Sequence, residues 1–348
     1  MNKSTVLRYD TSAMRTLLVK FPDQILDAVR IGKKSSVSSL LSQPKNVVVT
    51  GLGGSAIGGD LLRSYLSEEL PIPFFVNRHY CLPAFVDDRS LVIVSSYSGN
   101  TEETIAAHKD AIRRKASVVC ISSNGETEKL ARKSGHPLIT IPKGYPPRAA
   151  VGYSFFSPLL VLQKMKLIAS KEKDVTETVA LLRRKSKIYA SLSTKNPALS
   201  LAQELYGKLP IVYSSADRFD VVNLRWRGQF AENAKVLAFG HVLPEMNHNE
   251  LVGWKVLRCH MSQMAVIFLR DRKEHDRLRV RMRVTKEIVG EFAGKVLEVE
   301  SEGTSLLARM FSLIYLGDWV SYYLALLNGV DPTPVKVIDY LKRQLEKV

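Results

Sequence analysis

The chain has 348 residues, of which 45% are hydrophobic and 24% charged. This length suits two domains that each bury a core, and the composition excludes a disordered chain. The start MNKSTVLRYD lacks the apolar core of a signal peptide, and the longest apolar stretch, residues 149–162, is too short and too broken to span a membrane. We therefore expect a cytoplasmic globular protein with no membrane partner.

The three cysteines and the net charge narrow the expectation further. Cys81, Cys120 and Cys259 are odd in number and widely spaced, which argues against a disulfide framework or a thiolate metal cage. The net charge of +16 favours anionic partners. The basic residues are scattered among acidic ones, without an aromatic stacking platform or a nucleic-acid motif, so we expect no nucleic acid partner. A phosphorylated small molecule would also benefit from this positive field.

The first 43 residues are predicted to be helical, with Met14, Leu18, Phe21 and Ile25 on one apolar stripe. Short apolar runs then alternate with amphipathic helical patterns, which is typical of parallel strands joined by right-handed crossovers. The predicted strands of this half are NVVVT, PFFVN, SLVIVSS, SVVCIS and PLITIP. The sequence thus predicts a first parallel-sheet domain over residues 44–170.

The same alternation restarts in the second half, after a charged helical stretch at 171–190. LPIVYSS, MAVIFLR and KVLEVE are predicted strands, DVVNLRWRGQFAENAK is a predicted helix, and SLLARMFSLIYLGDWVSYYLALL is a long one. We expect an α/β fold of two doubly wound parallel sheets, with a second domain at 171–330 and a final helix within 331–348.

The segment GLGGSAIGG, residues 51–59, fits the dinucleotide-binding fingerprint at Gly51, Gly53 and Ala56. That fingerprint expects an acidic residue about twenty positions further on, where the chain has Asn77 and Arg78. An arginine suits a 2′-phosphate, so a nicotinamide-dependent reductase stays a distant alternative. No phosphate-binding P-loop motif occurs.

The segment SSYSGNTEET, residues 95–104, joins a predicted strand to a predicted helix. Asn100 is the expected N-cap, with Glu103 three residues later. Ser96, Ser98 and Thr101 then surround a helix N-terminus, where free N–H groups and the helix dipole attract an anion. This arrangement suits a single terminal phosphate, although an ordinary capped turn rich in Ser and Thr has the same composition.

Together, GLGGSAIGGDL and SSYSGNTEET resemble the sugar isomerase (SIS) domain, a flavodoxin-like phosphosugar-binding fold. The segments PPRAAVGY, FAENAK, LPEMNHNELVGW and DPTPVKVIDYLKRQL resemble the bifunctional phosphoglucose/phosphomannose isomerases, in motif order and over nearly the whole chain. The resemblance implies interconversion of glucose 6-phosphate and mannose 6-phosphate with fructose 6-phosphate. It also implies phosphate contacts from Gly53, Gly54, Ser55, Ser96, Ser98 and Thr101.

The same resemblance implies four catalytic residues. Glu232 in FAENAK is the expected base that moves a proton between C2 and C1, and His248 is the expected ring-opening residue. Arg148 matches the cation that stabilises the enediolate, and Lys342 matches a lysine that returns to the site on the last helix. Without the family, these residues would be interpreted as an ion-pairing glutamate and exposed loop or helix side chains.

No cofactor or metal is expected, because the seven histidines show neither His-x-x-His nor His-Glu-x-x-His spacing. The resemblance implies a homodimer with the site near the subunit interface. Three alternatives stay open: another SIS isomerase, a non-catalytic phosphosugar-binding regulator, and the reductase. A regulator would have no reason to keep Glu232, Arg148 and His248 together.

Overall fold

The structure is a computed structural model that describes residues 1–37, 43–216, 218–345 and 347. The predicted N-terminal helical segment therefore includes residues 38–42, which lie outside the described part. The chain divides into two compact units. The first unit is Lys20–Ala180 with Ser305–Ala308, and the second is Met1–Val19, Leu181–Thr304 and Arg309–Val348.

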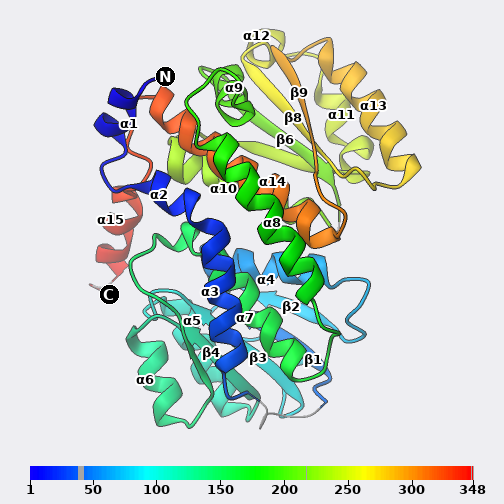
Figure 1. The fold of residues 1–348 in the computed structure, drawn as a ribbon. Coiled ribbons are helices and arrows are strands. Elements are labelled where there is room, and N and C mark those ends of the chain that lie inside the picture. Colours follow the sequence, from blue (N-terminus) through cyan, green and yellow to red (C-terminus); the bar gives the residue numbers. More distant parts are fainter. Residues whose placement is uncertain (38–42, 217, 346, 348) are drawn as a thin grey trace. The chain divides into compact units, whose positions relative to one another are not determined.

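The first unit contains a five-stranded parallel sheet in the order β2-β1-β3-β4-β5 (Figure 1). Its strands are β1 (Asn46–Thr50), β2 (Phe74–Asn77), β3 (Ser90–Ser96), β4 (Ser117–Ser122) and β5 (Leu138–Thr140). This is the flavodoxin-like strand order, in which the order of the strands along the sheet reverses between β1 and β3. The prediction of a doubly wound parallel sheet is confirmed for this unit.

Helices cover both faces of this sheet. On one face, α5 (Glu102–Arg113) and α6 (Gly125–Lys133) contribute Ala107, Ala111 and Ala131 to a core with Val92 and Val118. On the other face lies α4 (Gly54–Tyr65), whose Gly59 packs against Val49 of β1. The remaining elements of the unit are α3 (Phe21–Lys34), the 3₁₀ turn η1 (Pro147–Ala149), α7 (Val151–Lys164) and the first half of α8 (Glu172–Tyr189).

The second unit contains a four-stranded parallel sheet in the order β7-β6-β8-β9. Its strands are β6 (Leu209–Ser215), β7 (Phe239–Leu243), β8 (Met264–Arg270) and β9 (Lys295–Glu300). The first strand of this sheet has the second on one side and the third on the other, as in the first unit. Both sheets therefore have the same topology, apart from the fifth strand of the first sheet.

The helices of the second unit come from both ends of the chain. They are α1 (Lys3–Tyr9), α2 (Met14–Val19), α9 (Pro197–Leu205), α10 (Asp220–Gln229), α11 (Glu250–Gly253), α12 (Arg258–Met261), α13 (Asp276–Gly290), α14 (Leu306–Leu327) and α15 (Lys336–Leu345). A π-helix, η2 (Phe230–Ala234), continues α10, and a 3₁₀ turn, η3 (Glu245–His248), follows β7.

The sequence did not predict strand β7. Among the described residues it is an edge strand paired with β6 alone, and its first four residues are exposed or half-buried. Gly240 and His241 interrupt the apolar run that marked the other strands. Gly240 is needed because a Cβ there would lie 2.1 Å from the backbone oxygen of Val212 on β6.

By length and composition, helix α14 is long and apolar enough to span a membrane. Among the described residues, no other helix passes this test. The 18-residue window of α14 has a mean hydropathy of 1.3, and 89% of that window is buried inside the protein. Such burial is typical of a core helix.

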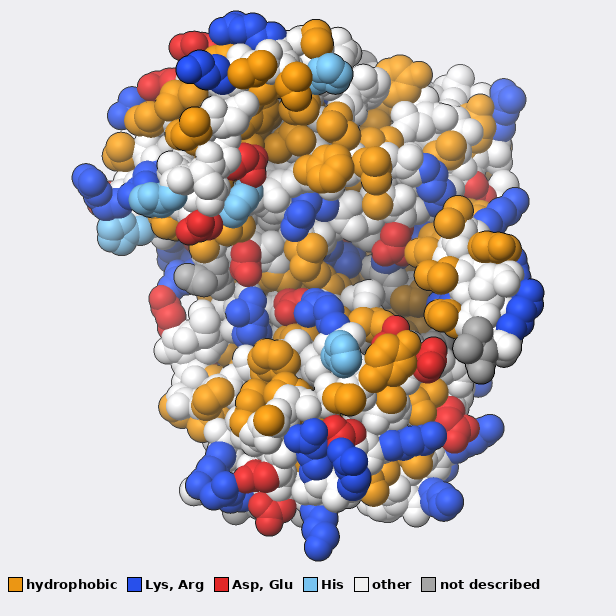
Figure 2. All heavy atoms as spheres, turned by 180° about the vertical axis from the view of Figure 1, so that it is seen from behind, with side chains coloured by type: hydrophobic (Ala, Val, Ile, Leu, Met, Phe, Trp, Pro, Cys, Tyr) orange, Lys and Arg blue, Asp and Glu red, His pale blue; other side chains and the backbone are white. Residues whose placement is uncertain are grey.

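Figure 2 shows how charges are spread over one face of the molecule. Lys and Arg side chains are distributed over the whole face in view, with Asp and Glu side chains between them. They do not gather into the continuous basic stripe that tracks a nucleic-acid backbone.

Helices α4 and α7 approach each other so closely that Gly58 has no room for a side chain. A Cβ at Gly58 would lie 2.4 Å from the backbone oxygen of Ser154. We expect Gly58→Ala to lower the free energy of unfolding by about 1–3 kcal/mol, because two helix backbones would have to separate. Chemical denaturation measures this change.

Gly290→Ala is the matched control, since Gly290 ends α13 and a Cβ there meets nothing within 4 Å. That variant should be neutral or slightly more stable, because alanine is the better helix former. If Gly58→Ala unfolded at the wild-type denaturant concentration, the close approach would have no energetic importance.

Candidate active site

The serine loop, residues 97–101, follows β3 at the switch point of the first sheet. Gly99 has φ +72°, and a Cβ there would lie 1.7 Å from the backbone oxygen of Asn124. The Tyr97 hydroxyl donates to the Pro142 carbonyl at 2.9 Å and accepts from the backbone N–H of Tyr145 at 2.8 Å. The loop is therefore held from both sides before any ligand arrives.

The capping of α5 differs from the prediction. The helix begins at Glu102 with Thr101, rather than Asn100, at the N-cap position. The Asn100 side chain instead accepts a hydrogen bond from the backbone N–H of Glu126 at 3.0 Å, in the first turn of α6. Asn100 thus joins the serine loop to the next loop of the sheet and leaves the start of α5 without a side-chain cap.

The glycine turn after β1 lies directly against the serine loop. The Ser55 hydroxyl accepts a hydrogen bond from the backbone N–H of Tyr97 at 3.1 Å. A Cβ at Gly51 would lie 2.7 Å from the backbone oxygen of Ser95. Gly53 has φ +52° and precedes α4, so the turn brings a second helix N-terminus to the same edge of the sheet.

Arg148 belongs to the same region of the first unit. It lies in η1, and a Cβ at Gly54 would be 2.4 Å from the Pro147 oxygen and 3.0 Å from the Arg148 nitrogen. The Ser154 hydroxyl donates to the Gly54 carbonyl at 2.9 Å. Arg148 is buried, with 3% of its surface exposed. The structure thus brings Arg148 and the two predicted phosphate loops together.

The region where a dinucleotide-binding protein holds its ribose is otherwise engaged. Arg78 forms an ion pair with Asp60 of α4, and the Asn77 amide donates to the His79 carbonyl at 2.8 Å. The arginine that suited a 2′-phosphate is therefore committed to a partner on its own unit. This contact weighs against the reductase alternative.

Glu232 lies in the π-helix η2 of the second unit and is half-buried. A π-helical turn widens the helix by one residue and is frequent at functional sites. The turn ends at Lys235, which has φ +59°. The Lys235 amine donates to the Pro334 carbonyl at 2.8 Å, so η2 is joined to the segment that leads into α15.

The helix that carries Glu232 is fixed along α14 by buried polar contacts. The Arg225 guanidinium pairs with the Asp318 carboxylate through two hydrogen bonds, of 3.1 and 2.8 Å. The Gln229 amide donates to the same carboxylate at 2.8 Å, and the Asn233 amide donates to the Ser321 hydroxyl at 3.0 Å. Burial raises the pKa of Asp318, and the facing guanidinium opposes that rise.

These residues were not predicted from the sequence, although a signal for them is present. Arg309 and Asp318 are the two charged residues in the 22 residues of α14. A charge in an otherwise apolar buried helix must have a partner, so each one indicates a fixed contact.

His248 and Lys342 also lie in the second unit, on separate elements. His248 ends η3, whose Met246 is buried in the core. The Asn247 amide donates to the Thr285 hydroxyl of α13 at 2.8 Å, which leaves the exposed His248 on an anchored turn. Lys342 is exposed on α15.

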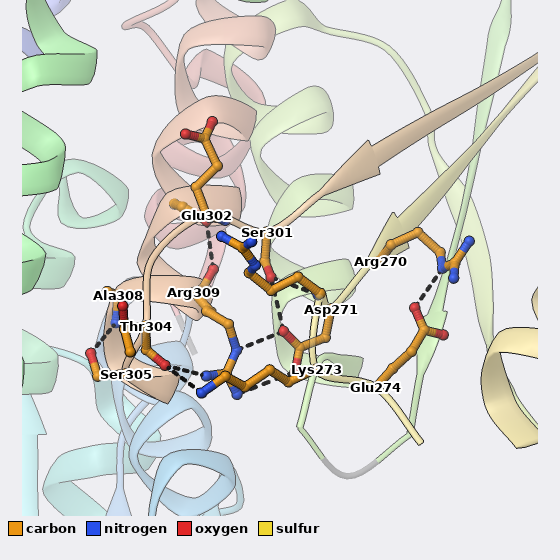
Figure 3. A network of polar contacts seen from close by, with 12 residues as sticks. Arg270, Asp271, Lys273, Glu274, Ser301, Glu302, Thr304, Ser305, Ala308 and Arg309 are labelled. Carbon is orange, nitrogen blue, oxygen red and sulfur yellow. Dashed lines mark hydrogen bonds and ion pairs between the residues drawn. The ribbon is translucent and has the colours of Figure 1, made fainter. Parts of the chain in front are cut away.

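In the second sheet, a buried ion pair joins the loops that follow β8 and β9. In Figure 3, Arg309 of α14 reaches the loop after β8, where its guanidinium pairs with Asp271 at 2.7 Å and donates to the Thr304 carbonyl at 2.7 Å. The Ser301 hydroxyl donates to the same carboxylate at 2.8 Å. The positive charge of Arg309 is thus neutralised by Asp271 of the same unit.

Comparison with known proteins agrees with these two units. Residues 40–163 match the SIS domain family, and residues 194–345 match the family described as the bacterial phospho-glucose isomerase C-terminal SIS domain. A glucose-6-phosphate isomerase-like protein of Thermus thermophilus has the same fold, with a TM-score of 0.65, 21% identity and coverage of 98% of both chains. The fold and the loops of the first unit thus define an SIS-domain protein.

Two similar proteins identify the family within this class to which the chain belongs. A bifunctional phosphoglucose/phosphomannose isomerase of Caldicellulosiruptor bescii is 45% identical over 94% of this chain and 97% of the relative. The enzyme of the same name from Aquifex aeolicus is 37% identical, over 88% and 92%. The chain belongs to the family of bifunctional phosphoglucose/phosphomannose isomerases.

The buried pair between Arg225 and Asp318 allows a stability prediction. We expect Asp318→Asn to lower the free energy of unfolding by about 3–5 kcal/mol, because it leaves a buried guanidinium without its counter-charge. Glu287→Gln is the control, since it removes the exposed pair with Arg283 and should cost at most about 1 kcal/mol. Equal denaturation midpoints for the two variants would contradict a stabilising role for the buried pair.

Proposed function

We propose that this enzyme interconverts glucose 6-phosphate and mannose 6-phosphate with fructose 6-phosphate by a metal-free proton transfer. The observation that carries the proposal is the junction of the glycine turn, the serine loop and Arg148 at one switch point, in a chain of this family. Two helix N-termini and several hydroxyl groups there suit a phosphate monoester.

In the proposed site, Ser96, Ser98 and Thr101 hold the phosphate together with Gly53, Gly54 and Ser55. The Ser98 hydroxyl is exposed and accepts from the backbone N–H of Asn100 at 3.3 Å, which leaves its own proton available for an anion. The tight backbone contacts at Gly54 and Gly99 support a loop that is formed before the substrate binds.

In the proposed reaction, the second unit provides the proton-transfer groups. His248 passes a proton between the ring oxygen and the anomeric hydroxyl to open the ring. The Glu232 carboxylate takes the C2 proton and returns it at C1, while the hydroxyl proton moves between O2 and O1. Arg148 stabilises the negative charge of the enediolate, and Lys342 assists ring opening or binds substrate.

The same residues serve both aldoses, because glucose and mannose phosphates differ only at C2. In the enediolate this carbon is planar, so the two epimers give one intermediate. The polar anchoring of η2 along α14 supports this role for Glu232, since a base must be fixed to within a hydrogen-bond length.

We also propose a homodimer with the site near the subunit interface. Helix α15 exposes an apolar stripe at i, i+1, i+4 and i+8, formed by Val337, Ile338, Leu341 and Leu345. Such a stripe is typical of a surface that another protein surface covers. Lys342 lies on the same helix, so a partner that covered this stripe would also approach this residue.

In this proposal, each predicted domain has its own role in binding or catalysis. Residues 44–170 bind the phosphate, residues 171–330 supply Glu232 and His248, and residues 331–348 return to the site. We propose that the enzyme acts in the cytoplasm, in carbohydrate metabolism, where glycolysis and gluconeogenesis share this conversion. Another SIS isomerase activity or a phosphosugar-binding regulator are the alternatives, and the next two experiments separate them.

Glu232→Gln removes the proposed base and keeps the size of the side chain. We expect glucose 6-phosphate and mannose 6-phosphate isomerisation to fall together, by at least about 100-fold, while fructose 6-phosphate still binds. Coupled assays with both sugars measure the rates, and calorimetry measures binding. Glu291→Gln, at an exposed glutamate directly after α13, should leave both rates unchanged.

Loss of only one of the two activities would contradict a base shared by both sugars. A wild-type protein that binds fructose 6-phosphate without converting it would favour the regulator.

Ser98→Ala removes one hydroxyl from the proposed phosphate site. We expect the KM for both sugar phosphates to rise about tenfold, with a smaller change in kcat, because a hydrogen bond to a charged group contributes about 1.5–3 kcal/mol. Ser191→Ala is a matched control, since the Ser191 hydroxyl makes the same contact with a backbone N–H two residues later, at 3.1 Å. Unchanged KM values in Ser98→Ala would remove the serine loop from the phosphate site.

A further inference from the structure

Three potential metal ligands meet beneath helices α5 and α6 of the first unit. His108 of α5 and Cys120 of β4 are fully buried, and His136, in the turn between α6 and β5, is half-buried. The His108 Nε2 lies 3.2 Å from His136 Nδ1 and 3.6 Å from Cys120 Sγ. All three ligand atoms lie within 4.8 Å of one another.

These separations match those around a tetrahedral zinc ion. With Zn–N of about 2.0–2.1 Å and Zn–S of about 2.3 Å, two nitrogens lie about 3.3 Å apart and a nitrogen and a sulfur about 3.6 Å apart. His108 already has both separations. His136 comes from a turn and is partly exposed, so its ring can move toward Cys120 and complete the third side of the triangle.

Without a metal, the hydrogen bonds of this cluster depend on the tautomer of His108. If His108 Nε2 carries a proton, it donates to His136 and the Cys120 thiol faces no nitrogen acceptor. If Nε2 is bare, the proton of His108 lies on Nδ1, which is buried and has no hydrogen-bond partner among the described residues. With its one proton or lone pair, His108 Nε2 serves one of its two neighbours at a time, whereas a cation would contact all three ligand atoms.

We propose that His108, Cys120 and His136 bind a zinc-like divalent cation, with one coordination position left for water beside His136. Binding forms bonds from two imidazole nitrogens and one thiolate to the ion, and the thiol proton passes to solvent. One thiolate with two imidazoles is a ligand set that zinc accepts.

Burial lowers the pKa of His108 to about 4, so its imidazole is neutral and has a lone pair for a metal near neutral pH. Burial raises the pKa of the Cys120 thiol to about 12, so the ion must displace its proton. Among the described residues, no carbonyl or carboxylate accepts a hydrogen bond from His108 Nδ1–H. We therefore expect the affinity for the ion to be roughly 10–100-fold below that of a site with such an acceptor.

The ion would add a direct link between three elements of the first unit. It would tie α5, β4 and the α6–β5 turn, and it would act on the stability of the first unit. The cluster lies under the helices, whereas the serine loop and Arg148 lie at the carboxyl edge of the strands. The inference is therefore independent of the proposed reaction.

The test uses the purified full chain, freed of metal by a chelator, in a Cys81→Ala/Cys259→Ala background that leaves Cys120 as the one thiol. Titration with Co²⁺ should give one equivalent of binding, with thiolate-to-cobalt charge-transfer absorption. Zn²⁺ should displace the cobalt and raise the midpoint of thermal unfolding.

Two further variants identify the ligands. Cys120→Ala should lose the charge-transfer absorption, and His136→Gln should bind at least about tenfold more weakly. His136 is half-buried, so metal-free His136→Gln should melt near the metal-free parent and separate lost binding from misfolding. Absence of charge-transfer absorption in the parent, or its survival in Cys120→Ala, overturns the proposal. Binding of Cu(I) without Co²⁺ or Zn²⁺ overturns it as well.

Discussion

The first unit depends on a backbone contact that leaves no room for a side chain. Helix α4 begins at Gly54 directly against the turn that carries Arg148, and one turn later Gly58 meets the backbone of α7. Because these contacts join backbone to backbone, the position of Arg148 relative to the glycine turn is set by the packing of α4 and α7. The Ser55 hydroxyl then fixes the serine loop against the same turn. One close helix contact thus places all three parts of the proposed phosphate and enediolate site.

The two sheets share a strand order but carry different groups at the carboxyl ends of their strands. In the first unit the point between β1 and β3 is surrounded by loops with glycines, hydroxyl groups and helix N-termini. In the second unit, Asp271 and Arg309 form a buried ion pair between the loops that follow β8 and β9. The second unit instead presents Glu232 from a widened helix that α14 holds through Asp318. In the proposed reaction, the first half of this repeated fold binds the phosphate and the second half positions a carboxylate.

Much of the fold could be predicted from the sequence, because continuous apolar runs followed by small residues mark buried parallel strands. The exception was β7, an edge strand whose Gly240 and His241 break the apolar pattern. The predicted N-cap at Asn100 was wrong by one residue, since that side chain satisfies the next helix instead. Sequence motifs also selected Glu232 and Arg148. They did not identify the partner of Asp318, because Arg225 lies 93 residues away. They did not identify the cluster around Cys120 either, because its residues come from a helix, a strand and a turn that meet when the sheet forms.

The anchoring of the serine loop has a consequence for substrate choice. The loop is bound to neighbouring segments through Tyr97, Gly99 and Asn100. Its conformational entropy is therefore lost when the protein folds and not when a ligand binds. The proposed phosphate site on this loop is therefore rigid and cannot change its shape to fit different hexoses. Such a site should bind any sugar that ends in the same phosphate monoester with similar affinity. Discrimination between sugars must then arise at carbon atoms remote from the phosphate.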